Sequence, residues 1–517
     1  MQLLLFVIIY WLISIGIGLY AALRVHNTTD YAVASRALPF YVVTATVFAT
    51  WFGSETVLGI PAKFLSNGLA GVVEDPFGSS LCLILVGLFF ARPLYRLNLM
   101  TIGDYYRLRF GRTVELITTV TIVISYLGWV AAQIKALGLV FYVLSDGGVS
   151  RELGMGLGAA SVLVYTLFGG MWSVAITDFI QMIVIVIGLL YIGWDVGERA
   201  GGVGHVIAHA RAAGKFNFWP EFNLNSIVMF VGTWITMMLG SIPQQDVFQR
   251  VQSSASEKIA VWASVLGGSL YFLFAFIPMF LAYCAILIAP DIVAKYAGED
   301  TQLILPKLVL SDKVPLFAQI MFFGALLSAI KSCASATLLA PSVTFSENFL
   351  RPILKSLKPD LTDRQFLRGM QVVVLLFTCG VTSFAMLSDQ SIYDLVGNAY
   401  KITLVAAFVP LLLGVYWKRA TTQGAIMSML LGLLTWITLE GVAAGAAPPE
   451  WLGVWLPHLV GFMVALVSFL VFSLCPQFMR TPPIPTPESA RQARMELHGH
   501  PGAHHGAALT QHTPNKP

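Results

Sequence analysis

Residues 47–68 read VFATWFGSETVLGIPAKFLSNG, an apolar segment that carries a carboxylate near its middle. Gly53, Gly59 and Pro61 surround this carboxylate, which belongs to Glu55. Glycine and proline both weaken the interior of a helix. Non-helical backbone is tolerated at membrane depth only where it is buried in protein or lines a cavity. The stretch therefore predicts a discontinuous membrane helix with a functional site at the break.

A second stretch has the same character. Residues 234–250 read WITMMLGSIPQQDVFQR, in which Gly240 and Pro243 stand just before Asp246. Discontinuous helices at corresponding positions of two halves are the best sequence sign of a transporter's binding site. The alternative is ordinary kinks, because proline and glycine are frequent in membrane helices. The two stretches lie about five predicted spans apart, which favours two five-helix repeats of opposite orientation.

Composition defines the class of protein. The chain has 517 residues, of which 57% are hydrophobic and 11% charged, and its mean hydropathy is +0.76. A soluble protein is expected to carry about 25% charged residues. Apolar runs of about 20 residues, the length that spans a bilayer as a helix, recur along the chain. We therefore predict an all-α integral membrane protein in the lipid bilayer, with no nucleic-acid partner and no obligate protein partner.

The hydropathy pattern predicts about thirteen membrane spans in a single membrane domain, residues 1–480, with a core at roughly 38–417. The predicted spans are residues 2–23, 38–65, 72–95, 114–143, 152–168, 172–197, 226–250, 258–289, 315–345, 366–388, 392–417, 421–445 and 454–476. Residues 481–517 are rich in proline, histidine, glutamine and alanine and have no apolar periodicity. We predict that this tail is disordered.

Charged loops predict the orientation of the chain. Lysine and arginine gather in the loops after the third, ninth and eleventh predicted spans. Membrane proteins keep loops of this composition in the cytoplasm. Because about thirteen spans separate the two ends, the N-terminus is predicted to lie outside and the C-terminal tail inside. The predicted location is the cell membrane (plasma or inner membrane), which the chain crosses many times.

Four short motifs suggest a family. The stretch YTLFGGMWSVAITDFIQ (165–181) resembles the signature of the sodium:solute symporter family. WFGSETVLG (51–59), QRVQSSASEK (249–258) and GVYWKRATTQG (414–424) are similar to other motifs of that family. The resemblance covers roughly residues 1–480. It implies a leucine-transporter-like core of ten helices in inverted repeats, and cation-driven import of a small organic solute by alternating access.

The resemblance also implies a sodium site between the first and eighth core helices. Carried over by position, the backbone carbonyls come from Ala49, Phe52 and Ala325. The family's pair of adjacent hydroxyl groups falls on Ser328 and Ala329, so that one hydroxyl is missing. A hard cation needs oxygen ligands, and the loss of one weakens its site. The expected sodium ligands are therefore Ala49, Phe52, Ala325 and Ser328.

Lys331 stands inside the apolar stretch GALLSAIKSCASA (324–336), where a charge is costly. It follows Ser328 by three positions and so neighbours it on the helix surface. Either Lys331 forms a structural ion pair or reaches a water-filled cavity, or it acts in coupling as a sodium surrogate or proton carrier. Asp178, whose family counterpart lies near the sodium exit path, and Asp246 are candidate partners.

The solute site is predicted around the two helix breaks. Its candidate residues are Trp51, Glu55, Thr56, Lys135, Gln245 and Asp246. Both signs of charge are present, which suits a carboxylate or a zwitterion better than a neutral sugar. Glu74 and Asp75 begin the third predicted span and are interpreted as a solvated helix N-terminus near the outer surface.

The predicted function is secondary active transport of a small organic solute, as a cation symporter. The first alternative is a sodium-independent or proton-coupled carrier in which Lys331 replaces the sodium ion. The second is a solute-sensing membrane module. An enzyme is not expected, because the apolar spans contain neither a histidine cluster nor a nucleophile–base motif. No cofactor is expected beyond a sodium ion or proton as the coupling ion.

Overall fold

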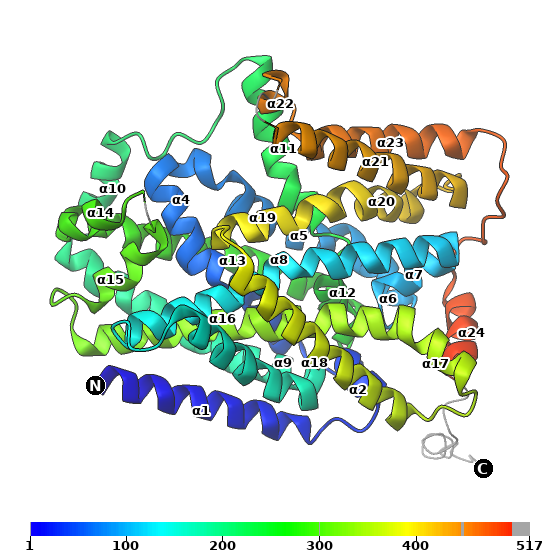
Figure 1. Ribbon diagram of the computed structural model, residues 1–517, viewed down its shortest axis with the longest axis horizontal. Helices are drawn as coiled ribbons and strands as arrows, with labels where there is room; N and C mark the ends of the chain where they lie inside the picture. The colour runs from blue at the N-terminus through cyan, green and yellow to red at the C-terminus, as the bar shows by residue number, and fades with distance from the viewer. Residues whose placement is uncertain (1, 299, 446–448, 499–517) are drawn as a thin grey trace, which may run out of the picture.

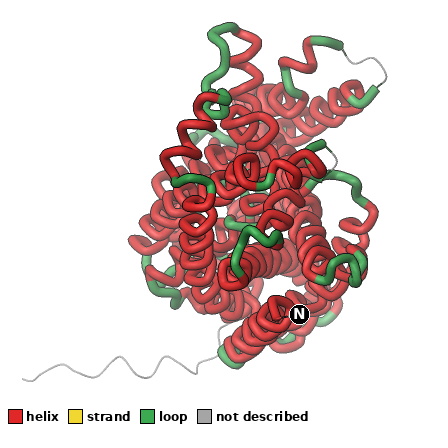
Figure 2. The backbone as a smooth tube through the Cα atoms, turned by 90° about the vertical axis from the view of Figure 1, so that its left-hand side faces the viewer, coloured by secondary structure: helices red, strands yellow, loops and turns green. Residues whose placement is uncertain are grey.

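Helices make up nearly all of the computed structural model, which describes residues 2–298, 300–445 and 449–498 (Figure 1). Figure 2 shows the same dominance of helices from the side, with short loops between them. The N-terminal helix α1 (Gln2–Ala22) lies along one side of the bundle. Its outward residues include Leu5, Phe6 and Leu12, which are each at least half exposed, as expected for a helix in contact with lipid.

The remaining elements of the first half follow α1 in chain order. They are α2 (Thr28–Val33), η1 (Ala34–Arg36), α3 (Phe40–Trp51), η2 (Glu55–Gly59), α4 (Ile60–Asn67), η3 (Gly68–Val72), η4 (Val73–Gly78), α5 (Ser79–Leu85), η5 (Val86–Phe90), α6 (Ala91–Arg96), α7 (Ile102–Phe110), α8 (Arg112–Leu144), α9 (Arg151–Arg199) and α10 (Val203–Ala212).

The second half repeats the pattern of long and broken helices. Its elements are α11 (Leu224–Gly240), α12 (Gln245–Ser253), α13 (Glu257–Ile288), α14 (Pro290–Tyr296), η6 (Thr301–Leu303), α15 (Ile304–Leu310), α16 (Leu316–Phe345), η7 (Ser346–Leu350), α17 (Arg351–Leu357), α18 (Asp363–Leu387), α19 (Ile392–Thr403), η8 (Leu404–Phe408), α20 (Val409–Tyr416), α21 (Thr422–Ala443), α22 (Trp451–Val454), α23 (Pro457–Leu474) and α24 (Pro487–His498).

The predicted fold class is confirmed, although the spans are joined differently. Within the described residues, ten helical runs are long and apolar enough to cross a membrane, or eleven if the bent pair α11–α12 is one span. This number is below thirteen partly because α9 contains two predicted spans, 152–168 and 172–197. A second run, Glu55–Arg96, also contains more than one predicted segment, and α3 is too short to count alone.

Gly170 divides α9 into the two predicted spans. Its φ of 46° and ψ of −137° lie outside the helical region. A Cβ atom at this position would also lie only 2.4 Å from the carbonyl oxygen of Tyr31. Only glycine accepts such a backbone without strain. The glycine pair in the family-like motif is therefore where the chain leaves one span and enters the next.

Gly170→Ala is expected to destabilise the protein by about 1–3 kcal/mol, because alanine is strained at this φ and its methyl group meets Tyr31. The measurement is the melting temperature of the purified protein in detergent. Gly156→Ala is the matched control in the same helix, since a Cβ atom there has nothing within 4 Å. Equal melting temperatures for the two variants would contradict the interpretation.

Both predicted helix breaks are present. Helix α3 ends at Trp51, and Phe52 has φ −85° and ψ 73°, so the chain leaves the helix before η2 begins. The second break separates α11 from α12, whose axes differ by 44°. Gly53 stands at the first break, and Gly240 and Pro243 stand at the second, which explains why these breaks were predictable.

Two backbone hydrogen bonds join the broken helices to each other. Leu38, just before α3, donates from its amide to Ser253 O at 3.1 Å. The Leu38 carbonyl accepts from the amide of Ala255 at 2.9 Å, just past the end of α12. The start of one broken helix is thereby connected to the end of the other.

The tail differs from the prediction. Helix α24 (Pro487–His498) lies within the segment predicted to be disordered, and residues 499–517 lie outside the described residues. The helix begins with reciprocal capping: Thr486 N donates to Ser489 Oγ (2.9 Å) and Ser489 N to Thr486 Oγ1 (3.2 Å). Such caps satisfy amides that a helix start leaves free, and overall composition does not reveal them.

Candidate functional site

The two helix breaks meet at a buried carboxylate. Asp246, in the first turn of α12, accepts a hydrogen bond on Oδ2 from Trp51 Nε1 at 3.1 Å. The hydroxyl of Tyr126 donates to Oδ1 and accepts from the Asp246 amide at 2.8 Å. Asp246 and Trp51 are 0% and 2% exposed. The side chains predicted at the two breaks therefore do come together, and α8 supplies a third member.

Helix α8 also holds the second predicted carboxylate. Gln133 Nε2 donates to Glu55 Oε2 at 2.7 Å, and Trp129 Nε1 donates to Oε1 at 3.3 Å. The other end of the Gln133 amide accepts from the backbone of Ser54 at 2.9 Å. Residues 126, 129 and 133 share one face of α8 because they are three and four positions apart. This face fixes the broken segment and its carboxylate in place.

Four aromatic rings surround this point. Trp51 and Trp129 have ring centroids 5.3 Å apart, and Tyr400 of α19 lies 5.9 Å from Trp51 and 5.5 Å from Trp129. Tyr126 stacks on Trp129 at 6.0 Å. We call these four residues the aromatic cluster. With Glu55 and Asp246 it combines π faces and carboxylates in one buried place.

Sequence reasoning missed four members of this site. Tyr126, Trp129 and Gln133 all lie on α8, and their spacing in the printed sequence was the available signal. Tyr400 had no such signal, since its place depends on how α19 packs. The predicted residue Thr56 is near the cluster: its hydroxyl lies 3.3 Å from Trp51 O and 3.1 Å from the Tyr271 hydroxyl.

Two predicted solute residues, Gln245 and Lys135, contact other parts of the chain. Gln245 accepts from the Ile102 amide at 2.8 Å and donates to Met100 O at 3.3 Å, so its side chain holds the loop before α7. Lys135 Nζ donates to the carbonyls of Ser388 and Gln390, both at 2.7 Å, at the end of α18. In these contacts, neither the Gln245 amide nor the Lys135 ammonium touches the aromatic cluster. The long lysine side chain follows the helix to a loop, as long charged side chains often do.

A second polar cluster lies beside the first break. Asp178 of α9 accepts from Ser332 Oγ at 2.6 Å and from Thr46 Oγ1, and it is fully buried. One turn along α3 from Thr46, the hydroxyl of Thr50 accepts from Arg250 at 2.8 Å. Helices α3, α9 and α16 thus bring oxygen atoms together near the C-terminal end of α3. The last carbonyls of a helix carry partial negative charge, so this end favours a cation.

Ser328, a predicted sodium ligand, makes its contacts outside this cluster. Its hydroxyl donates to Gly324 O at 2.7 Å and shares a hydrogen bond with Tyr10 of α1. Ala325, also predicted, packs on α9, because its Cβ atom is 3.0 Å from where a Cβ on Gly188 would be. The predicted face of α16 therefore turns toward α1 and α9.

The residues one turn later on α16 lie beside the first break. Ser332 contacts Asp178, as described, and Cys333 borders the break, because a Cβ atom on Gly53 would lie 2.8 Å from Cys333 Sγ. If the positions carried over from the family are shifted by four residues along α16, the carbonyl ligand falls on Ala329 in place of Ala325. The hydroxyl pair falls on Ser332 and Cys333 in place of Ser328 and Ala329. Ala49 and Phe52 keep their places at the end of α3.

Lys331 also faces α1 and not the two acids proposed as its partners. Its ammonium donates to Ser14 Oγ and to Trp11 O (3.4 Å). It lies 5.5 Å from the ring centroid of Tyr165 and 6.0 Å from that of Trp11. Among the described residues we find no ion pair for this lysine, which is 0% exposed. Cation–π contacts and hydroxyl or carbonyl acceptors compensate part of the burial.

Lys331→Met is expected to leave the sodium response of the protein unchanged, because the ammonium faces α1 and not the Asp178 cluster. The measurement is the melting temperature in NaCl against KCl at equal ionic strength. An ion that binds only the folded state raises stability by RT ln(1 + [L]/Kd). Loss of the sodium-induced shift in this variant, with the variant still folded, would restore a coupling role for Lys331.

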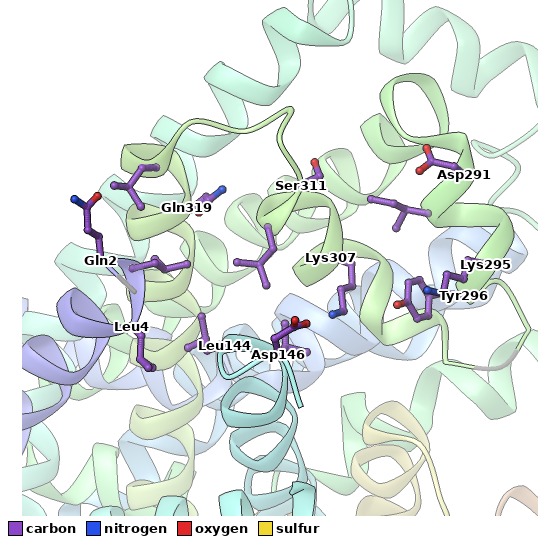
Figure 3. Close-up of a pocket in the computed structure, with 15 residues that line it drawn as sticks. Gln2, Leu4, Leu144, Asp146, Asp291, Lys295, Tyr296, Lys307, Ser311 and Gln319 are labelled. Carbon is purple, nitrogen blue, oxygen red and sulfur yellow. The ribbon is translucent and has the colours of Figure 1, made fainter. Parts of the chain in front are cut away.

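A large cavity is separate from both clusters. It measures about 820 Å³ and lies between the start of α1, the end of α8, and α14, α15 and α16 (Figure 3). Lys295, Lys307, Asp146 and Asp291 are among its lining residues. None of the residues predicted for the solute or sodium site lines it, so this cavity is not the predicted solute site.

Two discontinuous helices meeting at buried carboxylates and aromatic rings, within a helical membrane bundle, define a secondary active transporter. A sequence model of the sodium:solute symporter family matches residues 31–432. The chain belongs to the sodium:solute symporter family.

Relatives and solved structures agree with this assignment. The chain is 28% identical to the high affinity choline transporter 1 of Homo sapiens, over 84% of this chain and 76% of that protein. It is 26% identical to the sodium/proline symporter of Staphylococcus aureus (strain JH9), over 82% of this chain and 83% of that protein. These relatives are transporters and not enzymes.

The fold is shared with solved transporters. A sodium-coupled sialic acid symporter in a substrate-bound outward-open state aligns with a TM-score of 0.78 and 19% identity, covering 94% of this chain and 99% of the other. Mhp1, a nucleobase-cation-symport-1 family transporter in a closed conformation, aligns with a TM-score of 0.56 and 18% identity, covering 87% and 94%. The predicted leucine-transporter-type fold is confirmed. The protein is a multi-pass membrane symporter that couples solute transport to a cation.

Proposed function

We propose that this symporter imports a small organic cation whose ammonium group carries apolar substituents, as choline does, and that sodium drives the import. The observation that carries the proposal is the aromatic cluster with Glu55 and Asp246 at the meeting point of the two helix breaks. Aromatic faces attract cations through their quadrupoles, and cages of such rings recognise quaternary ammonium groups. Each cation–π contact contributes about 2 kcal/mol or more to binding when it is shielded from water.

The charges around the cluster support a cationic solute. Glu55 and Asp246 accept hydrogen bonds there from the neutral donors Trp129, Gln133, Trp51 and Tyr126. Arg250 is near, but its guanidinium donates to the Asp246 backbone carbonyl at 3.2 Å and to Thr50. Buried carboxylates need a positive partner or a proton. A cationic solute supplies that partner.

Two buried hydroxyl groups suit the polar end of such a solute. The hydroxyl of Tyr400 and that of Ser54 have no hydrogen-bond partner among the residues that the structure describes. Both residues are fully buried. A buried polar group without a partner is costly, and a hydroxyl on the solute would satisfy one or both of these groups.

A zwitterion is the second candidate, and it is the solute class that the sequence suggested. The similarity to a sodium/proline symporter favours it. Against it, Lys135, the basic residue among the candidate solute residues, donates to loop carbonyls. The relation to choline transporters at 28% identity favours the organic cation.

The proposed sodium site uses the positions shifted by four residues along α16. Its ligands are the carbonyls of Ala49, Phe52 and Ala329 and the hydroxyl of Ser332, with the carboxylate of Asp178 next to them. The contact between Ser332 and Asp178 supports this set. Cys333 stands where the family resemblance places a second hydroxyl, and a thiol is a softer ligand than oxygen. Neither a sodium-independent carrier based on Lys331 nor a solute sensor finds support in the family or its relatives.

The proposed orientation puts the N-terminus outside and the tail in the cytoplasm, with residues 1–480 as the transport domain and the solute exchanged by alternating access. Helix α24 of the tail lies beside a basic loop, because Pro487 and Arg491 line the same cavity as Arg96. In Figure 1, α1 begins at the opposite end of the molecule from α24. Loops rich in arginine face the cytoplasm, which supports a cytoplasmic tail.

The test is uptake by the purified protein in proteoliposomes. Radiolabelled choline and radiolabelled proline are offered separately, with an inward sodium gradient or with potassium in its place. We expect choline to accumulate only with the sodium gradient, and excess choline to block its own uptake while proline does not. Proline accumulation without choline uptake would favour the zwitterion. Equal choline uptake in potassium would refute sodium coupling.

A further inference from the structure

Asp75 is a buried acid that the mechanism above does not use. The sequence placed it at a solvated helix start, but it is only 1% exposed. Its Oδ1 accepts from Ser79 Oγ and from the Tyr271 hydroxyl, the latter at 2.5 Å. Its Oδ2 has no hydrogen-bond partner anywhere in the described chain. A carboxylate oxygen buried without a partner is costly unless something positive meets it.

Tyr271 links this acid to the first helix break. Its hydroxyl lies 3.1 Å from Thr56 Oγ1 in η2, while it donates to Asp75. Glu55, the residue before Thr56, is close enough to Asp75 for the two carboxylates to repel each other. Three elements, η2, η4 and α13, thus bring two carboxylates and two hydroxyl groups together. Oxygen atoms of this kind are the ligands that hard cations prefer.

Neutral groups surround these two acids: Glu55 accepts from Gln133 and Trp129, and Asp75 accepts from Ser79 and Tyr271. Among the described residues, neither acid forms an ion pair with lysine or arginine at 4.0 Å or less. The neighbouring acid Glu74 is the one that interacts with Lys401 and Lys63. Two carboxylates that repel each other inside the protein are stabilised by a cation between them. A cation bound from solution would offset this repulsion.

We propose that Asp75, Glu55, Thr56 and Tyr271 bind a second sodium ion, distinct from the one at Ser332 and Asp178. The first site lies at the end of α3, before the break, and the second lies after the break, against α13. The second ion would then offset the repulsion between Asp75 and Glu55. This inference rests on the proposed use of sodium as the coupling ion, and it holds whichever solute is carried.

The test counts sodium ions on the purified full-length protein, by equilibrium binding of radioactive sodium in a potassium buffer without solute. We expect two ions per protein for the natural chain and one for Asp75→Asn. At a sodium concentration that just saturates the natural protein, Ser332→Ala should also retain one ion, and the double variant close to none. Glu74→Gln is the matched control next to Asp75, and it should keep two ions.

Saturation of the natural protein at one ion, lost in Ser332→Ala, would overturn the second site and leave the first intact. Absence of sodium binding would overturn both. Two ions in a folded Asp75→Asn would overturn the assignment to Asp75. If Asp75→Asn does not fold, Tyr271→Phe and Thr56→Val remove the two hydroxyl groups, and each should weaken one of the two binding events by at least tenfold. An unchanged affinity in both variants would also overturn the site.

Discussion

Asp246→Asn is expected to weaken choline binding by about a hundredfold to a thousandfold. Two unit charges about 4 Å apart attract by about 4 kcal/mol at the effective dielectric constant typical of protein sites, and each 1.4 kcal/mol is a factor of ten. Asparagine keeps an oxygen that accepts from Trp51 or Tyr126, so the helix break keeps most of its contacts. The change therefore removes charge and retains shape.

Competition by choline against its radiolabelled form in proteoliposomes gives the affinity. Asp394→Asn is the control, because the Asp394 carboxylate accepts from Ser391, the N-cap of α19, and pairs with Lys63 at the surface, away from the aromatic cluster. We expect the control to bind choline as the natural protein does. An unchanged affinity in Asp246→Asn would mean that no positive charge of the solute lies near this carboxylate, and the proposed solute class would be wrong.

Ser332→Ala is expected to raise the sodium concentration needed for half-maximal stabilisation by about tenfold to a hundredfold. A hydrogen-bonding group that meets a charge contributes about 1.5–3 kcal/mol, and alanine removes both the proposed sodium ligand and the donor to Asp178. The measurement is the melting temperature against sodium concentration, with potassium as the replacement ion.

Ser328→Ala is the matched control, one helical turn earlier with the same chemistry. Its hydroxyl bonds Tyr10 and Gly324, so sodium affinity should not change. If Ser328→Ala lost sodium affinity and Ser332→Ala did not, the register taken directly from the family resemblance would be right, and the assignment made from the structure would be wrong.

The two helix breaks were predictable because their cause is local. Glycine, serine and proline around Glu55 and before Asp246 disfavour a continuous helix wherever the chain places them. The joint position of Trp51, Glu55, Thr56 and Asp246 followed, since two broken helices of inverted repeats meet at one place.

The sequence could not predict which face of α16 points toward the first break, and the reason is physical. From Phe322 to Thr344 almost every residue of this helix is buried, so no polar side marks its orientation. A change of one helical turn between Ser328 and Ser332 leaves the apolar pattern unchanged, so the sequence does not decide between the two hydroxyl groups. The same limit applies to Lys135 on α8, because a long flexible side chain reaches groups that lie far from its own helix face.

The paired backbone hydrogen bonds of Leu38 with Ser253 and Ala255 cannot be removed by changing a side chain. The start of α3 and the end of α12 should therefore travel as one body during turnover, whatever the surrounding helices do. Spin labels on the exposed residues Tyr41 and Ser256, next to this connection, should report one narrow distance distribution that stays the same with and without sodium. Substitutions can change every side chain of the binding site, and these two backbone hydrogen bonds still connect the two repeats.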